Sequence, residues 1–329
     1  MSRAGRRSMD RRAFIFAVAA VGLSTTPAIR AQPRKPYHVG VIYEGGPYTA
    51  IVDGLSDGCR ELGLDLGKDV FLELHDVHDR KVAGEAARAL EDAKTDLLYT
   101  LGTSVTLAVK DTTTRIPVVF VSGGDAVGVG LARTLARPGG RFTGIQYLSV
   151  DLTAKRLEIL REMLPKLHRV VTFYDPGNPV AGIKETRAAG RRLNIEIVER
   201  PVTSVAELKQ SLEALGLRDA DAYFYTPEAM VLGEARLVID AARAKKLPTM
   251  FGELSLVTLG ALASYGVNFY DVGRSSAKYV QRILTGTPPN DLAIESISRY
   301  GLGINLKTAQ ELGITVPQAV LLRADKVVE

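Results

Sequence analysis

Residues 96–125, DLLYTLGTSVTLAVKDTTTRIPVVFVSGGD, contain two short apolar runs separated by a segment with helical character. The runs at 97–101 and 117–121 are almost continuously apolar, which is typical of parallel strands that are buried on both faces. The segment 105–109 between them is predicted to be a helix. This strand–helix–strand stretch therefore indicates an α/β fold.

The same rhythm continues on both sides of this stretch and runs twice along the chain. Asp96 and Asp221 precede strands in similar apolar contexts, which predicts two lobes of similar plan. The tail is predicted to add a strand at 294–297, a helix at 307–312 and a helix from 317 through 328. The other predicted strands are 38–43, 70–74, 169–174, 195–198, 222–225 and 249–251, and the other predicted helices are 49–62, 81–93, 152–164, 179–193, 205–215 and 228–245.

The chain has 329 residues, of which 46% are hydrophobic and 24% charged, as expected of a folded protein with about two domains. Its formal net charge of +5 comes from the N-terminus. Residues 1–31 hold six arginines and one aspartate; without them, the 42 basic and 37 acidic residues become 36 of each. The basic excess therefore gives no support for nucleic-acid binding.

The N-terminal segment predicts export. An arginine-rich stretch, 1–12, precedes eleven uncharged apolar residues, 13–23, and small and polar residues follow up to Ala31. Eleven helical residues span about 16 Å, roughly half of a bilayer core, so a permanent membrane span is not expected. Arg11-Arg12 resembles the twin-arginine export motif. The alternative is an apolar helix that stays attached.

Most motifs of enzyme chemistry are absent. The sequence has no G-x-x-x-x-G-K-[ST] phosphate loop and no G-x-S-x-G nucleophile elbow. Cys59 is the only cysteine, which excludes an internal disulfide and zinc sites built from several thiolates. His75 and His78 are an odd number of residues apart, so on a strand they would face opposite ways. A solvated strand end is favoured there over a metal site, and we expect no cofactor.

Polar loops follow three of the predicted strands. Ligands of open α/β sheets bind at the carboxyl ends of the strands, where helix N-termini present free N–H groups. The segment 101–104 opens a helix with two hydroxyls, 122–125 contains two glycines and an aspartate, and Asn178 stands at a helix start in the second lobe. Simple helix capping is the alternative at each position. We expect all three loops to face one cleft.

Residues 117–140 and the segment 142–144 resemble the ABC-transporter substrate-binding proteins of the tryptophan/tyrosine-binding type. That family has a strand, a Gly-Asp-Pro-Val-Gly-like loop and a Leu-Ala-Arg-Pro-Gly-Gly-Asn-Val-Thr-Gly segment; here Ala126 replaces the proline and Arg141 the asparagine. The resemblance covers essentially the whole chain after the signal segment. Further family landmarks, in the expected order, are 155–158, 178–179, 264–266, 304–309 and 323–327.

This resemblance implies an α/β, two-lobed periplasmic binding protein fold of the type I kind. Each lobe would be a parallel sheet flanked by helices, and a three-segment hinge would join them. We expect a signal peptide at 1–31, an N-terminal lobe at 32–147, a C-terminal lobe at 148–266, and crossing segments with returning helices at 267–329. The ligand-binding residues carried over by position are Thr103, Ser104, Ser122, Asp125, Asn178, Thr226 and Tyr265.

The implied function is capture of a small molecule, with an amino acid favoured, and its delivery to an ABC permease. The mature protein is expected to be a periplasmic monomer without catalytic activity, nucleic-acid binding or membrane insertion. For an amino acid, Thr103 and Ser104 are expected to meet the carboxylate, and Asp125 the ammonium. The alternatives are an exported α/β enzyme that uses Ser104 or Asp125, and a ligand sensor that docks on a signalling receptor.

Overall fold

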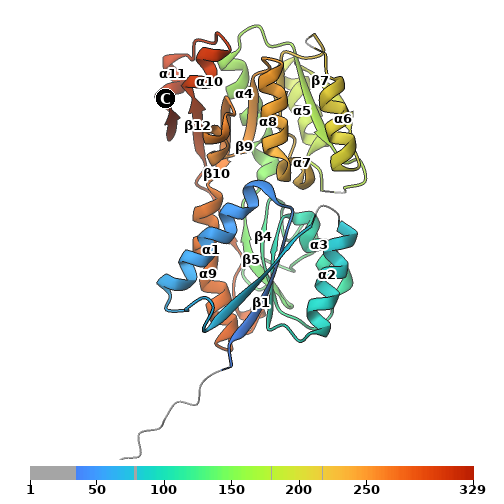
Figure 1. Ribbon diagram of the computed structural model, residues 1–329, viewed down its shortest axis with the longest axis vertical. Helices are drawn as coiled ribbons and strands as arrows, with labels where there is room; N and C mark the ends of the chain where they lie inside the picture. Colours follow the sequence, from blue (N-terminus) through green and yellow to red (C-terminus); the bar gives the residue numbers. More distant parts are fainter. Residues whose placement is uncertain (1–34, 78–79, 179, 217) are drawn as a thin grey trace, which may run out of the picture. The chain divides into compact units, whose positions relative to one another are not determined.

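The computed structural model describes residues 35–77, 80–178, 180–216 and 218–329. The predicted signal segment, 1–31, lies outside the described residues, as do His78, Asp79 and Pro179. Within the described residues, the strands form one six-stranded and one seven-stranded sheet, each in its own lobe (Figure 1). The predicted two-lobed α/β architecture is therefore confirmed.

The first-lobe sheet has the strand order β11-β5-β4-β3-β1-β2, and all of its pairings are parallel. Consecutive residues of one strand point to opposite faces of the sheet, and here both faces are buried: Leu98 packs with the cluster around α2 and α3, whereas Tyr99 packs with the cluster around α1 and α9. The bounds of these strands are β1 Tyr37–Tyr43, β2 Val70–Asp76, β3 Leu97–Leu101, β4 Val118–Ser122, β5 Phe142–Gln146 and β11 Glu295–Ser296.

The second-lobe sheet has the order β13-β12-β10-β9-β8-β6-β7, and its one antiparallel pairing joins β10 to β12. In each lobe, an aspartate in front of one strand accepts backbone N–H groups at the start of a neighbouring strand. Asp96 accepts the N–H of His38 at 2.8 Å, and Asp221 accepts the N–H groups of His168 and Arg169 at the same distance. The strands are β6 Arg169–Tyr174, β7 Glu196–Pro201, β8 Ala222–Phe224, β9 Thr249–Glu253, β10 Ala263–Val267, β12 Gly301–Asn305 and β13 Lys326–Val328.

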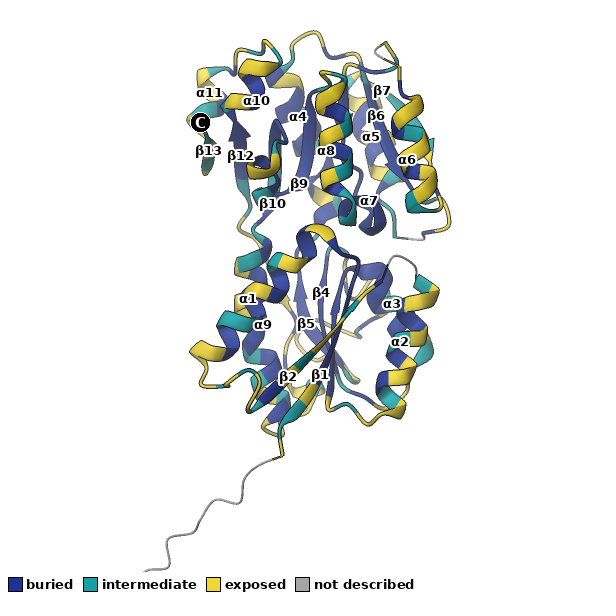
Figure 2. Ribbon diagram, in the orientation of Figure 1, coloured by how far each residue is buried: buried dark blue, intermediate teal, exposed yellow. Residues whose placement is uncertain are grey.

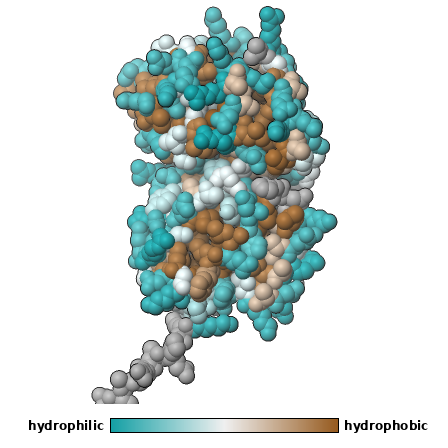
Figure 3. Space-filling view, viewed as in Figure 1, coloured by the Kyte–Doolittle hydropathy of each residue, from teal (hydrophilic) through white to brown (hydrophobic). Residues whose placement is uncertain are grey.

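Helices cover both sheets with one buried and one exposed side, as Figure 2 shows for α2, α6 and α8. On the face seen in Figure 3, hydrophilic side chains surround scattered apolar patches, as on ordinary protein surfaces. The α-helices are α1 Thr49–Glu61, α2 Arg80–Asp92, α3 Thr103–Thr112, α4 Thr153–Met163, α5 Ile183–Leu193, α6 Val205–Ala214, α7 Ala229–Gly233, α8 Ala235–Ala244, α9 Phe269–Leu284, α10 Leu306–Glu311 and α11 Gln318–Leu321. The 3₁₀ segments are η1 Gly46–Tyr48, η2 Ser149–Leu152, η3 Leu254–Leu259 and η4 Pro289–Asp291.

The chain passes between the lobes three times: after β5, after β10 and between β11 and β12. The second crossing delivers α9 to the first lobe, where it packs against α1. Glycines allow this contact to be very close, because a Cβ at Gly54 would lie 2.0 Å from the Tyr270 carbonyl oxygen and one at Gly273 would lie 2.0 Å from that of Ile51. The backbones of α1 and α9 are therefore in direct contact, whereas side chains separate the backbones of most packed helices.

Several predicted elements need correction. The expected helix at 317–328 is wrong, because only α11 is helical there and β13 adds to the sheet edge beside β12. Asp325 draws this segment into the sheet, since its carboxylate accepts the N–H of Leu302 at 2.8 Å. The expected helix at 228–245 is divided at Glu234 into α7 and α8. Helix α9 and strands β5, β10 and β12 were not predicted as such.

Candidate functional site

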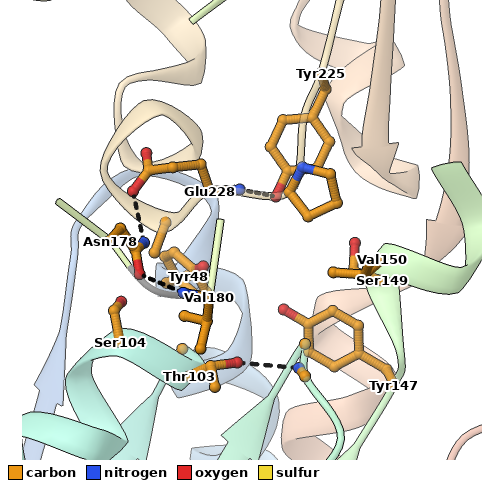
Figure 4. A pocket seen from close by; sticks show the side chains of 15 residues that line it. Tyr48, Thr103, Ser104, Tyr147, Ser149, Val150, Asn178, Val180, Tyr225 and Glu228 are labelled. Atoms are coloured by element: carbon orange, nitrogen blue, oxygen red, sulfur yellow. Dashed lines mark hydrogen bonds between the residues drawn. The ribbon is translucent and has the colours of Figure 1, made fainter. Parts of the chain in front are cut away.

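A cavity lies between the two lobes, at the carboxyl ends of strands from both sheets (Figure 4). The space between its lining atoms, including space that is open to solvent, is about 390 Å³. Its walls combine hydroxyls, an amide, a carboxylate and aromatic rings. The lining residues are Tyr48, Gly102, Thr103, Ser104, Gly123, Gly124, Tyr147, Ser149, Val150, Asn178, Val180, Tyr225, Pro227, Glu228 and Ala229.

The first-lobe wall is built on the turn from β3 into α3. Gly102 makes that turn with a φ of 94°, a conformation that glycine adopts without strain. Thr103 is held in place by two hydrogen bonds, one with the hydroxyl of Ser122 at 2.8 Å and one from the N–H of Gly124 at 3.0 Å. Ser104 donates to Oε1 of Glu44 at 3.1 Å. The hydroxyls at this wall are therefore already oriented by the protein.

The second-lobe wall centres on Glu228, the N-cap residue of α7, which is only 6% exposed. Its Oε2 accepts the N–H of Val231 at 2.8 Å, and its Oε1 accepts from the side-chain amide of Asn178 at 3.0 Å. The other side-chain atom of Asn178, Oδ1, accepts the N–H of Val180 at 3.2 Å. Desolvation by burial raises the pKa of Glu228, so this carboxyl gains from a cation that reaches it.

Three tyrosines supply most of the aromatic surface of the cavity. Tyr48 stacks on Phe269 with ring centroids 5.3 Å apart, and Tyr147 meets the same ring edge-on at 5.7 Å. Tyr225 stacks on Phe251. Burial raises the pKa of all three phenols, so they stay protonated and can donate hydrogen bonds. The rings come from both lobes, because Tyr48 precedes α1 and Tyr225 follows β8.

A second space of about 450 Å³ adjoins the cavity and shares Ser104, Asn178 and Glu228 with it. We call this space the acidic annex. It combines acidic side chains from both lobes with one arginine. Its remaining lining residues are Glu44, Arg80, Asp175, Thr203 and Met230.

The structure brings three of the seven predicted site residues together at the cavity: Thr103, Ser104 and Asn178. Ser122 lies behind the wall, where it supports Thr103. Thr226 is fully buried, and its hydroxyl is engaged by Thr172 at 2.8 Å and by Thr186.

Asp125 and Tyr265 are not among the residues that line the cavity. Asp125 is exposed, and its Oδ1 accepts the N–H of Val127 at 3.0 Å, so it caps its own turn. The ring of Tyr265 packs against Tyr300, with centroids 6.3 Å apart. The carbonyl of Tyr265, which lies in β10, accepts from Nε of Arg156 at 2.8 Å.

Sequence reasoning missed five residues that shape the cavity and the annex: Glu44, Tyr48, Tyr147, Ser149 and Glu228. The rule about carboxyl ends of strands applies equally to the loop after β1, and it would have found Glu44 and Tyr48. Tyr147 and Ser149 follow β5, a strand that was not predicted. Glu228 was identified only as the start of a helix.

In the described residues, no group of three or more His, Cys, Asp or Glu side chains has the arrangement of a metal site. Among the helices of the same residues, none is both long and apolar enough to cross a bilayer.

One family model matches most of this chain. The family model described as ABC transporter substrate binding protein matches residues 38–328. The tyrosine-binding protein of Clostridioides difficile is 23% identical over 289 residues, which cover 86% of this chain and 83% of that protein.

Solved structures share the fold of this chain. A conserved domain protein from Vibrio cholerae O1 biovar El Tor has a TM-score of 0.80 at 29% identity, covering 89% of this chain and all of that one. The ABC domain of Streptococcus pneumoniae in complex with L-Trp has a TM-score of 0.78 at 22% identity, with the same coverage. The resemblance read from residues 117–144 is thereby confirmed. This chain belongs to the ABC transporter substrate-binding protein family.

Proposed function

We propose that this protein binds an aromatic amino acid in the cavity between its lobes and delivers it, chemically unchanged, to an ABC permease. The observation that carries this proposal is the cavity itself, which combines three tyrosine rings with a buried carboxylate. Aromatic rings favour an aromatic partner through stacked and edge-on contacts, and a buried carboxylate favours a cation. An aromatic amino acid carries both groups.

The ammonium of the ligand is assigned to Glu228. Both oxygens of this carboxylate already accept hydrogen bonds, so its orientation is fixed. Burial disfavours its ionised form and raises its pKa, so a positively charged group beside it would stabilise the carboxylate. Ser104 supports the same assignment. Its hydroxyl proton is donated to Glu44, so its lone pairs are left to accept from a donor such as an ammonium.

The named relatives support the ligand class. One is described as a tyrosine-binding protein, and another was solved in complex with L-Trp. Both names describe ligands that combine an aromatic ring with a zwitterionic head. The cavity of this chain offers partners for each of these parts.

Export to the periplasm, the absence of catalysis and a monomeric state complete the proposal. Export rests on the arginine-rich and apolar segment at 1–31. The lack of catalysis rests on the family, whose members bind substrates for transport. A signalling receptor remains the alternative partner to a permease.

Isothermal titration of the mature protein, residues 32–329, tests the proposal. Tyrosine, tryptophan and phenylalanine are compared with leucine, which keeps the zwitterion but lacks the ring. We expect one-to-one binding of at least one aromatic amino acid, weaker binding of leucine, and a ligand that is recovered intact. At 100 times its dissociation constant, such a ligand should stabilise the fold by about 2.7 kcal/mol. Absence of binding by all three aromatic amino acids, or conversion of any of them, would contradict the proposal.

A further inference from the structure

Arg156, on α4, is fully buried beneath the cavity. Its Nε donates to the carbonyl of Tyr265 at 2.8 Å, and its Nη1 donates to the carbonyl of Ser149 at 2.7 Å. Its Nη2 donates to the hydroxyl of Ser149 at 3.1 Å. Within the described part of the chain, no ion pair joins this guanidinium to a carboxylate. A fully buried positive charge held only by neutral acceptors is uncommon and calls for a compensating anion.

The charge of Arg156 persists at neutral pH. Burial lowers its pKa to about 10, which still leaves the guanidinium protonated. The ring of Tyr225, a cavity residue, lies 5.8 Å from the guanidinium carbon and offers weak cation–π compensation. Gly252 leaves room for both groups, because a Cβ there would lie 2.7 Å from the Tyr225 ring and 3.0 Å from the guanidinium carbon.

The hydrogen bond from Arg156 determines whether the Ser149 hydroxyl acts as a donor or as an acceptor towards the cavity. A guanidinium can only donate, so the oxygen of Ser149 must accept and its own proton is free to be donated elsewhere. Ser149 lines the cavity. It therefore presents a donor to the ligand, and a buried positive charge stands directly behind that donor.

The opposite side of the cavity has the reverse polarity. There, Ser104 donates to Glu44, and Glu228 offers carboxylate oxygens. In Figure 4, Ser149 and Tyr147 lie on one side of the cavity, and Glu228, Asn178 and Ser104 lie on the other. The cavity thus has a donating, positive side and an accepting, negative side.

We propose that Ser149 is the carboxylate subsite of the cavity and that Arg156 acts through it as a positioning residue. This inference rests on the proposed function, which it deepens by orienting the zwitterion. It also moves the expected carboxylate partner away from Ser104, whose proton is already donated to Glu44.

The test compares wild-type protein with Ser149→Ala, using three ligands that differ only in their charged groups. Tyrosine carries both charges, tyramine lacks the carboxylate, and 3-(4-hydroxyphenyl)propionate lacks the ammonium. A hydrogen bond to a charged group typically changes affinity by roughly tenfold or more. We therefore expect Ser149→Ala to lose about that factor for tyrosine and for the propionate, and less than about twofold for tyramine. Ser56→Ala, which removes a hydroxyl bonded to the carbonyl of Val52 in α1, is the matched control and should change none of the three.

Arg156→Gln and Arg156→Lys examine the charge behind Ser149. Loss of the charge in Arg156→Gln should reduce the preference for tyrosine over tyramine, and Arg156→Lys should retain part of it. A merely structural role would weaken all three ligands by the same factor. If the glutamine variant fails to fold, the Ser149→Ala comparison decides alone.

The outcomes separate this inference from the proposed function. Wild-type protein that binds none of tyrosine, tryptophan and phenylalanine refutes both. If tryptophan or phenylalanine binds in place of tyrosine, its own amine and propionate analogues replace tyramine and the hydroxyphenyl propionate in the comparison. If wild-type protein binds tyrosine, two results overturn the Ser149 subsite but leave the proposed function intact. In the first, Ser149→Ala binds tyrosine as tightly as wild-type protein does. In the second, Ser149→Ala loses as much affinity for tyramine as for tyrosine.

Discussion

Asp125 and Glu228 show how residues of similar chemistry acquire different roles. Asp125 follows a buried strand and two glycines, a sequence context typical of a ligand loop. Its carboxylate nevertheless turns back to the N–H of Val127 and stays exposed. Glu228 has the context of an ordinary helix start, yet it is buried at the cavity. Burial, which tertiary contacts alone determine, makes one carboxylate useful for recognition and leaves the other solvated.

Asp125→Asn should therefore spare ligand affinity. Asparagine keeps a side-chain oxygen that can cap the turn, so we expect a stability change below about 1 kcal/mol. Calorimetry with tyrosine and a thermal melt would measure both quantities. A tenfold loss of affinity would restore Asp125 as the ammonium partner and contradict the role of Glu228.

Glu228→Gln should weaken binding of tyrosine by at least about tenfold, because the variant cannot offer a full negative charge to the ammonium. Glu199→Gln is a suitable control, since Glu199 pairs with Arg187 on the lobe surface. Titration of the two variants side by side gives the comparison. Equal affinities would remove Glu228 from the site.

The pH dependence of binding follows from the raised pKa of Glu228. An ammonium favours the ionised carboxylate, so affinity should fall as the pH drops from neutral towards 4.5, the ordinary glutamate value. In the free protein the sign is opposite: the folded state holds this proton more tightly than the unfolded state, so this group reduces stability as the pH rises above 4.5. The pH dependence of affinity and the pH dependence of stability should both be weaker in Glu228→Gln. Neither should vanish, because Glu44, Asp175 and Arg80 also face the annex.

At the scale of elements, η1 of the first lobe and α7 of the second lobe meet backbone to backbone. A Cβ at Gly46 would lie 2.0 Å from the carbonyl oxygen of Gly233, and one at Gly233 would lie 2.1 Å from that of Glu44. Real Cβ atoms do not approach so closely, so the two lobes reach this distance only because both positions are glycine. The contact adjoins Glu44, Tyr48 and Glu228, and we therefore expect it to limit how far the cavity can close.

Gly233→Ala should weaken ligand binding without contacting the ligand. The added methyl group opposes the approach of the lobes, and overpacking of this kind costs about 1–3 kcal/mol, which corresponds to about 5- to 150-fold in affinity. Alanine also favours the helical conformation, so the melting temperature of the free protein should hold or rise. Gly140→Ala, where nothing lies within 4 Å of the added atom, is the control. Unchanged affinity in Gly233→Ala would show that this contact does not limit closure.

At the scale of the whole molecule, the largest apolar cluster joins the lobes, from Val39 and Ile51 in the first to Tyr223 and Phe251 in the second. The cavity lies between the two lobes, so we expect a ligand to enter it when the lobes part. The crossings after β5 and β10 and between β11 and β12 can act as the hinge.

We expect the free protein to sample an open form and tyrosine to shift it to the closed one. Small-angle scattering of residues 32–329 should give a smaller radius of gyration with saturating ligand. Identical profiles, with binding shown by calorimetry in the same sample, would rule out a large closure.

The proposed export through the twin-arginine route leads to a separate prediction about the N-terminus. Replacing Arg11 and Arg12 together by lysine should leave full-length precursor in the cytoplasm, because the twin-arginine route reads both arginines. Fractionation of cells with an antibody against the mature chain measures this. Normal export of the variant would reject the twin-arginine assignment and leave a general signal peptide as the alternative.

The α/β class, the two-lobed plan and the family could all be predicted from local patterns along the chain. These rest on short-range signals: apolar runs such as 117–121 bury both faces of a strand wherever it lies, and Asp96 and Asp221 tie strand starts within their own lobes. Thr103, Ser104 and Asn178 were found for the same reason, since helix starts after strands are local features.

Which polar groups meet at the cavity depends on long-range contacts of the fold. Glu228, Tyr48 and Ser149 come from segments far apart in the chain, and neither their burial nor their orientation follows from nearby residues. The same holds for β13, whose three residues become a strand because β12 offers an unpaired edge. Long-range pairing and burial depend on the whole fold, so local sequence patterns could not predict them.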